Sequence, residues 1–199
     1  TVELISAFSD PRIKLTSLSN NEGPGYCRDL GLKRAHGAYI SFLDSDDLWC
    51  SDFLNVYIQA LQDYKVDLVY GSYIMKNELR SKVFKPKDLC FDQLFIQNPL
   101  SCLAVLMTRN SAYGHTFSGG PREDLFFWSQ VLKNPALKSY KIDKPLAIYH
   151  LRKSSRSSQK LAVAGYQLKM TFDREEFSFL KKIWIFCNYL YFGLRKYRL

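Results

Sequence analysis

The stretch Tyr39-Ile40-Ser41-Phe42-Leu43-Asp44-Ser45-Asp46-Asp47 decides the fold of this 199-residue chain. Its first five residues are rich in apolar and β-forming types and predict a short buried strand. The strand ends in three carboxylates, whose mutual repulsion requires a compensating cation or a network of donors. Hard oxygen ligands of this kind suit Mg2+ or Mn2+, and open α/β sheets bind their ligands at the carboxyl ends of strands. The segment therefore indicates a metal–diphosphate site, with Asp44, Asp46 and Asp47 as candidate ligands.

A simpler interpretation of the same residues is a solvated acidic turn. In that case Asp46 or Asp47 would cap the helix that the sequence predicts to begin near Asp52. The four residues alone leave both interpretations open, so their surroundings have to decide between them.

Upstream of this stretch, the sequence predicts a strand, a turn and a helix. Residues 12–18 have the composition of a strand, and the Asn- and Gly-rich residues 20–25 predict a turn. Apolar and small residues at helical spacing then predict a helix over residues 26–37, with Gly37 as its stop. The order is strand, helix, strand, which is a βαβ unit. Arg28 lies in the first turn of the helix, where it either points at a bound anion or lies solvated on the surface.

These residues resemble the family 2 glycosyltransferases of the GT-A fold. The matching runs are NEGPGYCRDLGL at residues 21–32 and AHGAYISFLDSDDLW at residues 35–49. The family pattern is N-x-G, a helix with A-R-N, and then A-x-G-x-Y-I-x-F-L-D-x-D-D-x-W. The chain departs from it at Cys27-Arg28-Asp29, where the Arg is kept and its neighbours differ.

The resemblance implies a nucleotide-sugar donor whose diphosphate is held by Mn2+ or Mg2+ at the D-x-D motif. By position, the donor-binding residues are Asn21, Gly23, Arg28, Asp44, Ser45 and Asp46. Asp46, Asp44 and Asp47 are the corresponding metal ligands. A metal acting as a Lewis acid makes a nucleoside diphosphate a better leaving group, which agrees with the chemistry of these residues.

A second acidic segment follows at residues 119–128, with the sequence GGPREDLFFW. The family carries a Glu-Asp pair here, and its Asp matches Asp124. As a general base, Asp124 would deprotonate the acceptor hydroxyl opposite the leaving diphosphate, which gives inversion. Glu123 would orient the site or cap the helix that follows. The alternative for Glu123 and Asp124 is a structural role, in which the two carboxylates complement the dipole at the N-terminus of a helix.

The remaining patterns complete an α/β sheet flanked by helices. We expect a helix over residues 52–64, strands at 67–75 and 103–107, and a closing strand at 141–150. His150, at the end of that strand, is a candidate metal ligand, although a lone His is also commonly structural.

The C-terminal part differs from the rest in charge. Residues 150–199 hold 11 Lys and Arg against 3 Asp and Glu, whereas the first 149 residues are almost neutral. We therefore expect a glycosyltransferase domain at 1–150 and, at 151–199, a basic loop and an amphipathic, membrane-proximal helical tail. Its aromatic and basic residues 177–199 favour an anionic membrane surface, with a helix packed on the core as the alternative. No recognition motif supports nucleic-acid binding.

Five scattered cysteines and the absence of a signal peptide predict a cytoplasmic protein, peripheral on the inner face of the cytoplasmic membrane. The resemblance covers residues 1 to about 158. These residues have no counterpart of the family's first strand or of the segment that binds the nucleotide base. We thus expect a fragment of a longer enzyme or a truncated form with an impaired donor site.

The overall prediction is an inverting glycosyltransferase in surface polysaccharide synthesis (lipopolysaccharide, capsule or exopolysaccharide), with a glycan or polyprenyl-linked acceptor. The alternative is a catalytically impaired relative that acts as a membrane-associated scaffold.

Overall fold

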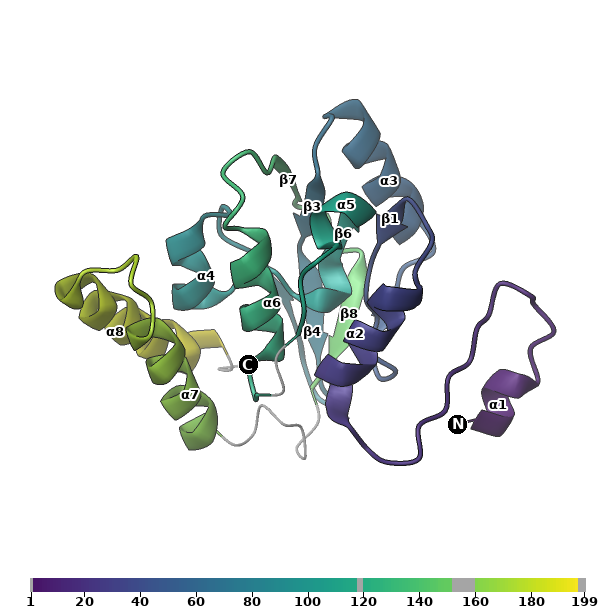
Figure 1. Ribbon diagram of the computed structural model, residues 1–199, viewed down its shortest axis with the longest axis horizontal. Coiled ribbons are helices and arrows are strands. Elements are labelled where there is room, and N and C mark those ends of the chain that lie inside the picture. The colour runs from purple at the N-terminus through teal and green to yellow at the C-terminus, as the bar shows by residue number, and fades with distance from the viewer. Residues whose placement is uncertain (1, 118–119, 152–159, 197–199) are drawn as a thin grey trace.

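The computed structural model describes residues 2–117, 120–151 and 160–196, which form a mixed α/β fold (Figure 1). The helices are α1 (Val2–Ser6), α2 (Gly23–Arg34), α3 (Phe53–Asp63), α4 (Phe91–Gln97), α5 (Arg109–Ala112), α6 (Glu123–Val131), α7 (Lys160–Phe172) and α8 (Phe179–Lys196), with a 3-10 turn η1 (Cys102–Ala104). The strands are β1 (Tyr39–Ile40), β2 (Leu48–Trp49), β3 (Leu68–Gly71), β4 (Tyr73–Lys76), β5 (Ser81–Phe84), β6 (Val105–Thr108), β7 (Ser139–Ile142) and β8 (Ala147–His150).

The strands form two four-stranded sheets. The first has the order β1-β6-β3-β7 and the second the order β2-β8-β4-β5. The pairs β3–β7 and β4–β8 are parallel, and the others are antiparallel. Because β1 belongs to one sheet and β2 to the other, the acidic segment between them crosses from sheet to sheet. This crossing puts the carboxylates where the two sheets diverge.

The helix predicted over residues 52–64 forms as α3. Its apolar residues Phe53, Tyr57, Ala60 and Leu61 are all buried, as a 3.6-residue period requires of a helix with one face on a sheet. Trp49 stacks on Phe53 with their ring centroids 4.4 Å apart, which fastens β2 to the start of α3. The segment that follows the acidic turn is thus anchored in one of the two core clusters.

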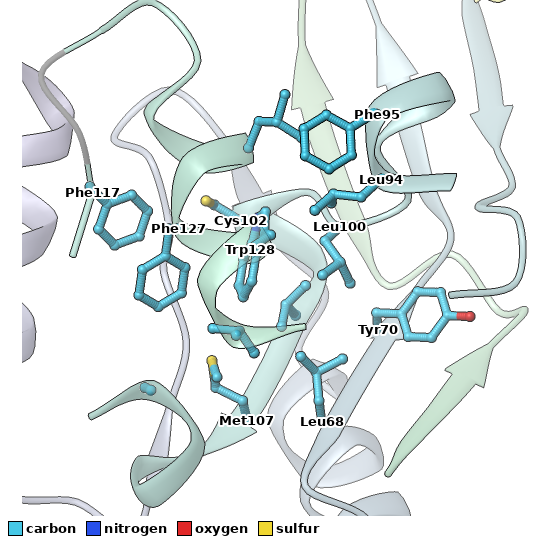
Figure 2. Packing of buried hydrophobic residues seen from close by; sticks show 14 of the residues in the cluster. Leu68, Tyr70, Leu94, Phe95, Leu100, Cys102, Met107, Phe117, Phe127 and Trp128 are labelled. Carbon is cyan, nitrogen blue, oxygen red and sulfur yellow. The ribbon is translucent and has the colours of Figure 1, made fainter. Parts of the chain in front are cut away.

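A second core cluster lies between α6, α4 and the first sheet (Figure 2). Phe127 and Trp128 of α6, Phe95 of α4 and Leu68 and Met107 of the sheet are fully buried or nearly so. Burial of large apolar side chains of this kind is the main stabilising term in a fold. It fixes α6, and with it the acidic pair at its N-terminus.

The C-terminal helix α8 packs on this core through one face. Ile185 is fully buried within the cluster, and Lys181 makes an ion pair of 2.8 Å with Asp92 of α4. The packed helix that the sequence left as an alternative is therefore present. The opposite face of α8 exposes apolar side chains, including Leu180, Ile183, Trp184 and Tyr191. None of the helices described here combines the length and the apolar character needed to cross a bilayer.

Several predicted boundaries are wrong. Residues 12–18 form no strand, because no strand in the described part of the chain pairs with them, and Ile13 and Leu15 are exposed. The strands predicted at 67–75 and 141–150 are each split into two, one in each sheet. The helix predicted to stop at Gly37 ends at Arg34. The sequence analysis did not foresee α4 or α7.

Candidate functional site

The acidic residues 44–47 form a hydrogen-bonded turn between the two sheets. The Asp47 amide donates to the Asp44 carbonyl at 3.0 Å, and Ser45 is exposed at the tip. Asp47 is only 5% exposed, which contradicts a fully solvated turn. The capping alternative is also wrong, since the N-cap of α3 is Asp52 and makes no side-chain capping bond.

Arg28 joins this turn to the acidic start of α6. Its Nη2 donates to Asp44 Oδ1 at 2.6 Å, and its Nη1 donates to Glu123 Oε1 at 3.4 Å. The side chains of Arg28 and Glu123 are 12% and 13% exposed, so this pair is largely desolvated, whereas the Asp44 side chain is 43% exposed. Burial works to lower the pKa of Arg28, but the surrounding negative charges, Asp44 and Glu123 among them, raise it above its ordinary value. Arg28 is thus a fixed cation between two predicted site segments, and the solvated alternative is wrong.

The position of Arg28 follows from how α2 begins. Asn21 Oδ1 accepts the amide of Gly23 at 3.1 Å, and Gly23 has a positive φ of 80°, a conformation that glycine adopts without strain. This turn starts the helix one turn before Arg28. Asn21 and Gly23, predicted to bind the donor, therefore also shape the helix that carries Arg28.

Asp124 is the second residue of α6 and is held from two sides. Asn98 Nδ2 donates to its Oδ2 at 3.0 Å, and Arg122 Nε lies 4.0 Å from its Oδ1. Its side chain is 34% exposed, so it remains reachable from solvent. Glu123 beside it pairs with Arg28, which agrees with the orienting role expected for it.

Asp47 and His150 tie the turn to the end of β8. The His150 amide donates to Asp47 Oδ1 at 3.0 Å. Burial raises the pKa of Asp47 to about 6, against the opposing effect of this hydrogen bond. The ring Nδ1 of His150 lies 2.6 Å from the Asp46 carbonyl. A carbonyl oxygen only accepts hydrogen bonds, so Nδ1 carries a proton in this contact and Nε2 is the ring nitrogen left for another partner.

This arrangement bears on the predicted metal ligands. No three His, Cys, Asp or Glu side chains of the described residues are grouped as a metal cluster, since Asp44 faces Arg28 and Asp47 faces a backbone amide. The donor types nevertheless fit a hard divalent cation. A histidine whose Nδ1–H is held by a backbone carbonyl is also the usual form of a metal-ligating imidazole. His150, which contacts the backbone carbonyl of Asp46, lies at the same turn as these carboxylates.

Sequence reasoning missed three residues of this site. They are Asn98 and Arg122, which contact Asp124, and Cys102, a buried thiol whose pKa is raised by burial and which interacts electrostatically with the charged cluster. Arg122 lies in the GGPREDLFFW motif, but the motif predicts no role for it. No local pattern marks Asn98 or Cys102, because their roles depend on contacts with residues distant in sequence.

Comparison with known proteins agrees with this geometry. The sequence model described as "Glycosyl transferase family 2" matches residues 1–125. The chain belongs to this family. It is a glycosyltransferase, as the sequence predicted.

Several curated relatives carry the names of glycosyltransferases. This chain is 30% identical to UDP-Glc:alpha-D-GlcNAc-diphosphoundecaprenol beta-1,3-glucosyltransferase WfgD of Escherichia coli, over 96% of its own length and 76% of that protein. It is 28% identical to the putative teichuronic acid biosynthesis glycosyltransferase TuaG of Bacillus subtilis, over 94% and 76% of the two chains.

Among solved structures, the fold matches that of S. aureus TarS 1-349 in complex with UDP-GlcNAc. The TM-score is 0.62 at 18% identity, over 89% of this chain and 55% of the other. The chain therefore spans about half the length of that TarS structure. The likeness confirms the predicted GT-A fold.

Proposed function

We propose that this family 2 glycosyltransferase transfers a sugar, with inversion, from a nucleotide-diphosphate donor to a hydroxyl of a glycan or polyprenyl-linked acceptor in surface polysaccharide synthesis. The observation that carries the proposal is the Arg28 bridge. One guanidinium contacts both Asp44 of the D-x-D turn and Glu123, a residue 95 positions away from Arg28. It brings the donor motif and the base motif into one site. The names of WfgD and TuaG support a lipid-linked or polymeric acceptor.

The proposed roles follow from the contacts. Asp44, Ser45 and Asp46 face the sugar diphosphate, and Arg28 fixes the turn that carries them. Asp124 accepts the proton of the acceptor hydroxyl, and Asn98 sets the orientation of its carboxylate through the 3.0 Å bond. Asp46 and His150 would hold Mn2+ or Mg2+, which when bound would neutralise the charge that develops on the leaving diphosphate.

The test is a transfer assay with radiolabelled nucleotide sugars in the presence of Mn2+ or Mg2+. We expect Asp124→Asn to slow transfer by about 10²- to 10⁴-fold, the usual contribution of a general base, while donor binding persists. Asp46→Ala should weaken donor binding only when the metal is present. Failure of the unaltered protein to bind any nucleotide sugar with either metal would overturn the proposal. Donor hydrolysis that is lost in both variants would exclude the scaffold alternative.

We further propose that the protein attaches peripherally to the inner face of the cytoplasmic membrane through α8. The support is the row of exposed apolar residues Leu180, Ile183, Trp184 and Tyr191. Such a row on one helix face suits the boundary of headgroups and acyl chains. Leu180→Ser with Trp184→Ser should reduce sedimentation with vesicles that contain anionic lipid, whereas Leu79→Ser, at an exposed residue of the β4–β5 hairpin, should not. Equal sedimentation of both variants would contradict attachment through α8.

A further inference from the structure

A groove separates the β4–β5 hairpin from helices α4 and α8. It has a volume of about 210 Å³ and is lined by Met75, Lys82, Val83, Phe84, Lys85, Gln97 and Phe192. In Figure 1, α4 lies between α8 and the sheet to which β4 belongs. The groove contains none of the residues proposed above for donor or metal binding, so it is a separate feature.

The walls of the groove combine apolar and cationic groups. Phe84 and Met75 are buried and Phe192 is half-buried, whereas Lys82 and Lys85 are exposed. Within the described part of the chain, neither lysine makes an ion pair. The nearby carboxylates Asp88 and Asp92 are already paired with Lys141 and Lys181.

The hairpin itself carries an excess of positive charge. Residues 76–87 contain five Lys or Arg and a single acidic residue, Glu78. Unpaired cations at the edge of an apolar groove favour an anionic ligand that also has an apolar part.

Gln97 contributes a hydrogen-bond acceptor that has no donor within the described residues. Its side-chain oxygen Oε1 is buried and has no hydrogen-bond partner. A buried acceptor without a partner costs roughly 1 to 3 kcal/mol, which would be recovered if the Gln97 side chain turned its oxygen toward a ligand hydroxyl in the groove. The groove thus suits a molecule with a hydroxyl, a phosphate and an apolar segment.

Two elements that line the groove are also connected to Asp124. Gln97 in its wall is followed directly by Asn98, whose amide contacts the Asp124 carboxylate at 3.0 Å. Phe192, on another wall, is one helical turn from Tyr189, whose ring lies 5.7 Å from the Arg122 guanidinium. Arg122 in turn is 4.0 Å from Asp124. Asn98, directly after α4, and Tyr189 of α8, through Arg122, therefore link the elements that form the groove with the proposed base.

We infer that this groove binds the acceptor, with Lys82 and Lys85 on the phosphate groups that join its sugar to its lipid. The inference rests on the proposed function and adds the location and the chemistry of the acceptor. A sugar hydroxyl donates to Gln97, and the apolar segment of the lipid lies on Phe84 and Phe192. A neutral acceptor would use only part of this groove.

The test compares two acceptors on the full chain. One is a saccharide on a short lipid diphosphate, and the other is the same saccharide on a neutral alkyl chain. In Lys82→Ala/Lys85→Ala we expect the KM for the diphosphate acceptor to rise on the order of 10- to 100-fold, as for lost charged hydrogen bonds. The KM for the neutral acceptor and the rate of donor hydrolysis should not change. The control Lys33→Ala/Lys138→Ala removes the same charge at exposed positions outside the groove and should behave as the unaltered protein.

Direct binding separates this inference from the proposed function. Calorimetric titration with the diphosphate lipid needs no turnover, so a loss of affinity in Lys82→Ala/Lys85→Ala alone supports the groove even without observed transfer. Competition by inorganic diphosphate at the concentration of the lipid acceptor would show a simple anion site and overturn the inference. Unchanged affinity in the double variant would overturn it as well. Gln97→Leu should weaken both acceptors, because both present the same sugar.

Discussion

The guanidinium of Arg122 lies over the ring of Tyr189, with its Cζ 5.7 Å from the ring centroid. This contact joins α8 to the residue that precedes the acidic pair of α6. A second contact joins α7 to the same loop, since an added Cβ at Gly120 would collide with the ring of Tyr166. The C-terminal helices therefore support the loop that leads to Asp124, in addition to any role at a membrane.

The first prediction concerns the packing of α8. Ile185→Ala should lower the free energy of unfolding by about 2 to 5 kcal/mol, because it leaves a cavity at a fully buried position. Leu180→Ala, at a residue 78% exposed on the same helix, should change it by less than about 0.5 kcal/mol. Urea unfolding followed by circular dichroism measures both. Equal effects of the two substitutions would mean that α8 does not pack on the core in solution.

The second prediction concerns the contact between Tyr189 and Arg122. Tyr189→Leu removes the aromatic face, which is worth about 0.5 to 2 kcal/mol to a cation, so Arg122 should lose its fixed position beside Asp124. We expect a fall in kcat with little change in the KM for donor. Tyr189→Phe keeps the ring face and should restore kcat. Tyr113→Leu, at a position that is 77% exposed and outside α8, is the control, and an equal loss there would contradict a specific role for Tyr189.

The sequence predicted the part of the site that lies in one continuous motif. The acidic turn and the helix α3 follow from local patterns and from the D-x-D resemblance, whereas the buried strand predicted over residues 39–43 is limited to Tyr39–Ile40 and Leu43 is exposed. Glu123 and Asp124 were also found, because the family motif marks them.

The rest depends on contacts that no local pattern records. Residues 12–18 look like a strand, but a strand needs a neighbour for its hydrogen bonds. The strand predicted over 67–75 is divided at Ser72, where the chain passes from the first sheet, in which β3 pairs with β6 and β7, to the second, in which β4 pairs with β5 and β8. Asn98 contacts Asp124 only through the approach of α4 to α6.

The third prediction concerns Arg28. Arg28→Gln leaves Asp44 and Glu123 without their shared cation, and loss of one partner of a largely buried ion pair typically costs about 3 to 5 kcal/mol. Arg12→Gln removes a fully exposed pair with Asp10 and should have no measurable effect. Thermal unfolding of both variants provides the comparison. A stable Arg28→Gln protein that still binds donor would show that the bridge holds neither the fold nor the site.

The last prediction is a pH dependence that arises from Asp47. Burial raises the pKa of its carboxyl group to about 6 in the folded protein, above the ordinary value of 3.8. The folded state therefore holds this proton more tightly than the unfolded state, and ionisation of Asp47 destabilises the fold as the pH rises from about 4 to 6. The loss is on the order of 1 to 3 kcal/mol.

Asp47→Asn cannot ionise but keeps an oxygen that accepts the His150 amide. In the presence of a chelator, its stability should therefore exceed that of the unaltered protein above pH 6 and approach it near pH 4. Urea unfolding at a series of pH values measures the difference between the two proteins. A difference that stays constant from pH 4 to 7 would show that Asp47 titrates at its ordinary pKa and is not desolvated in solution.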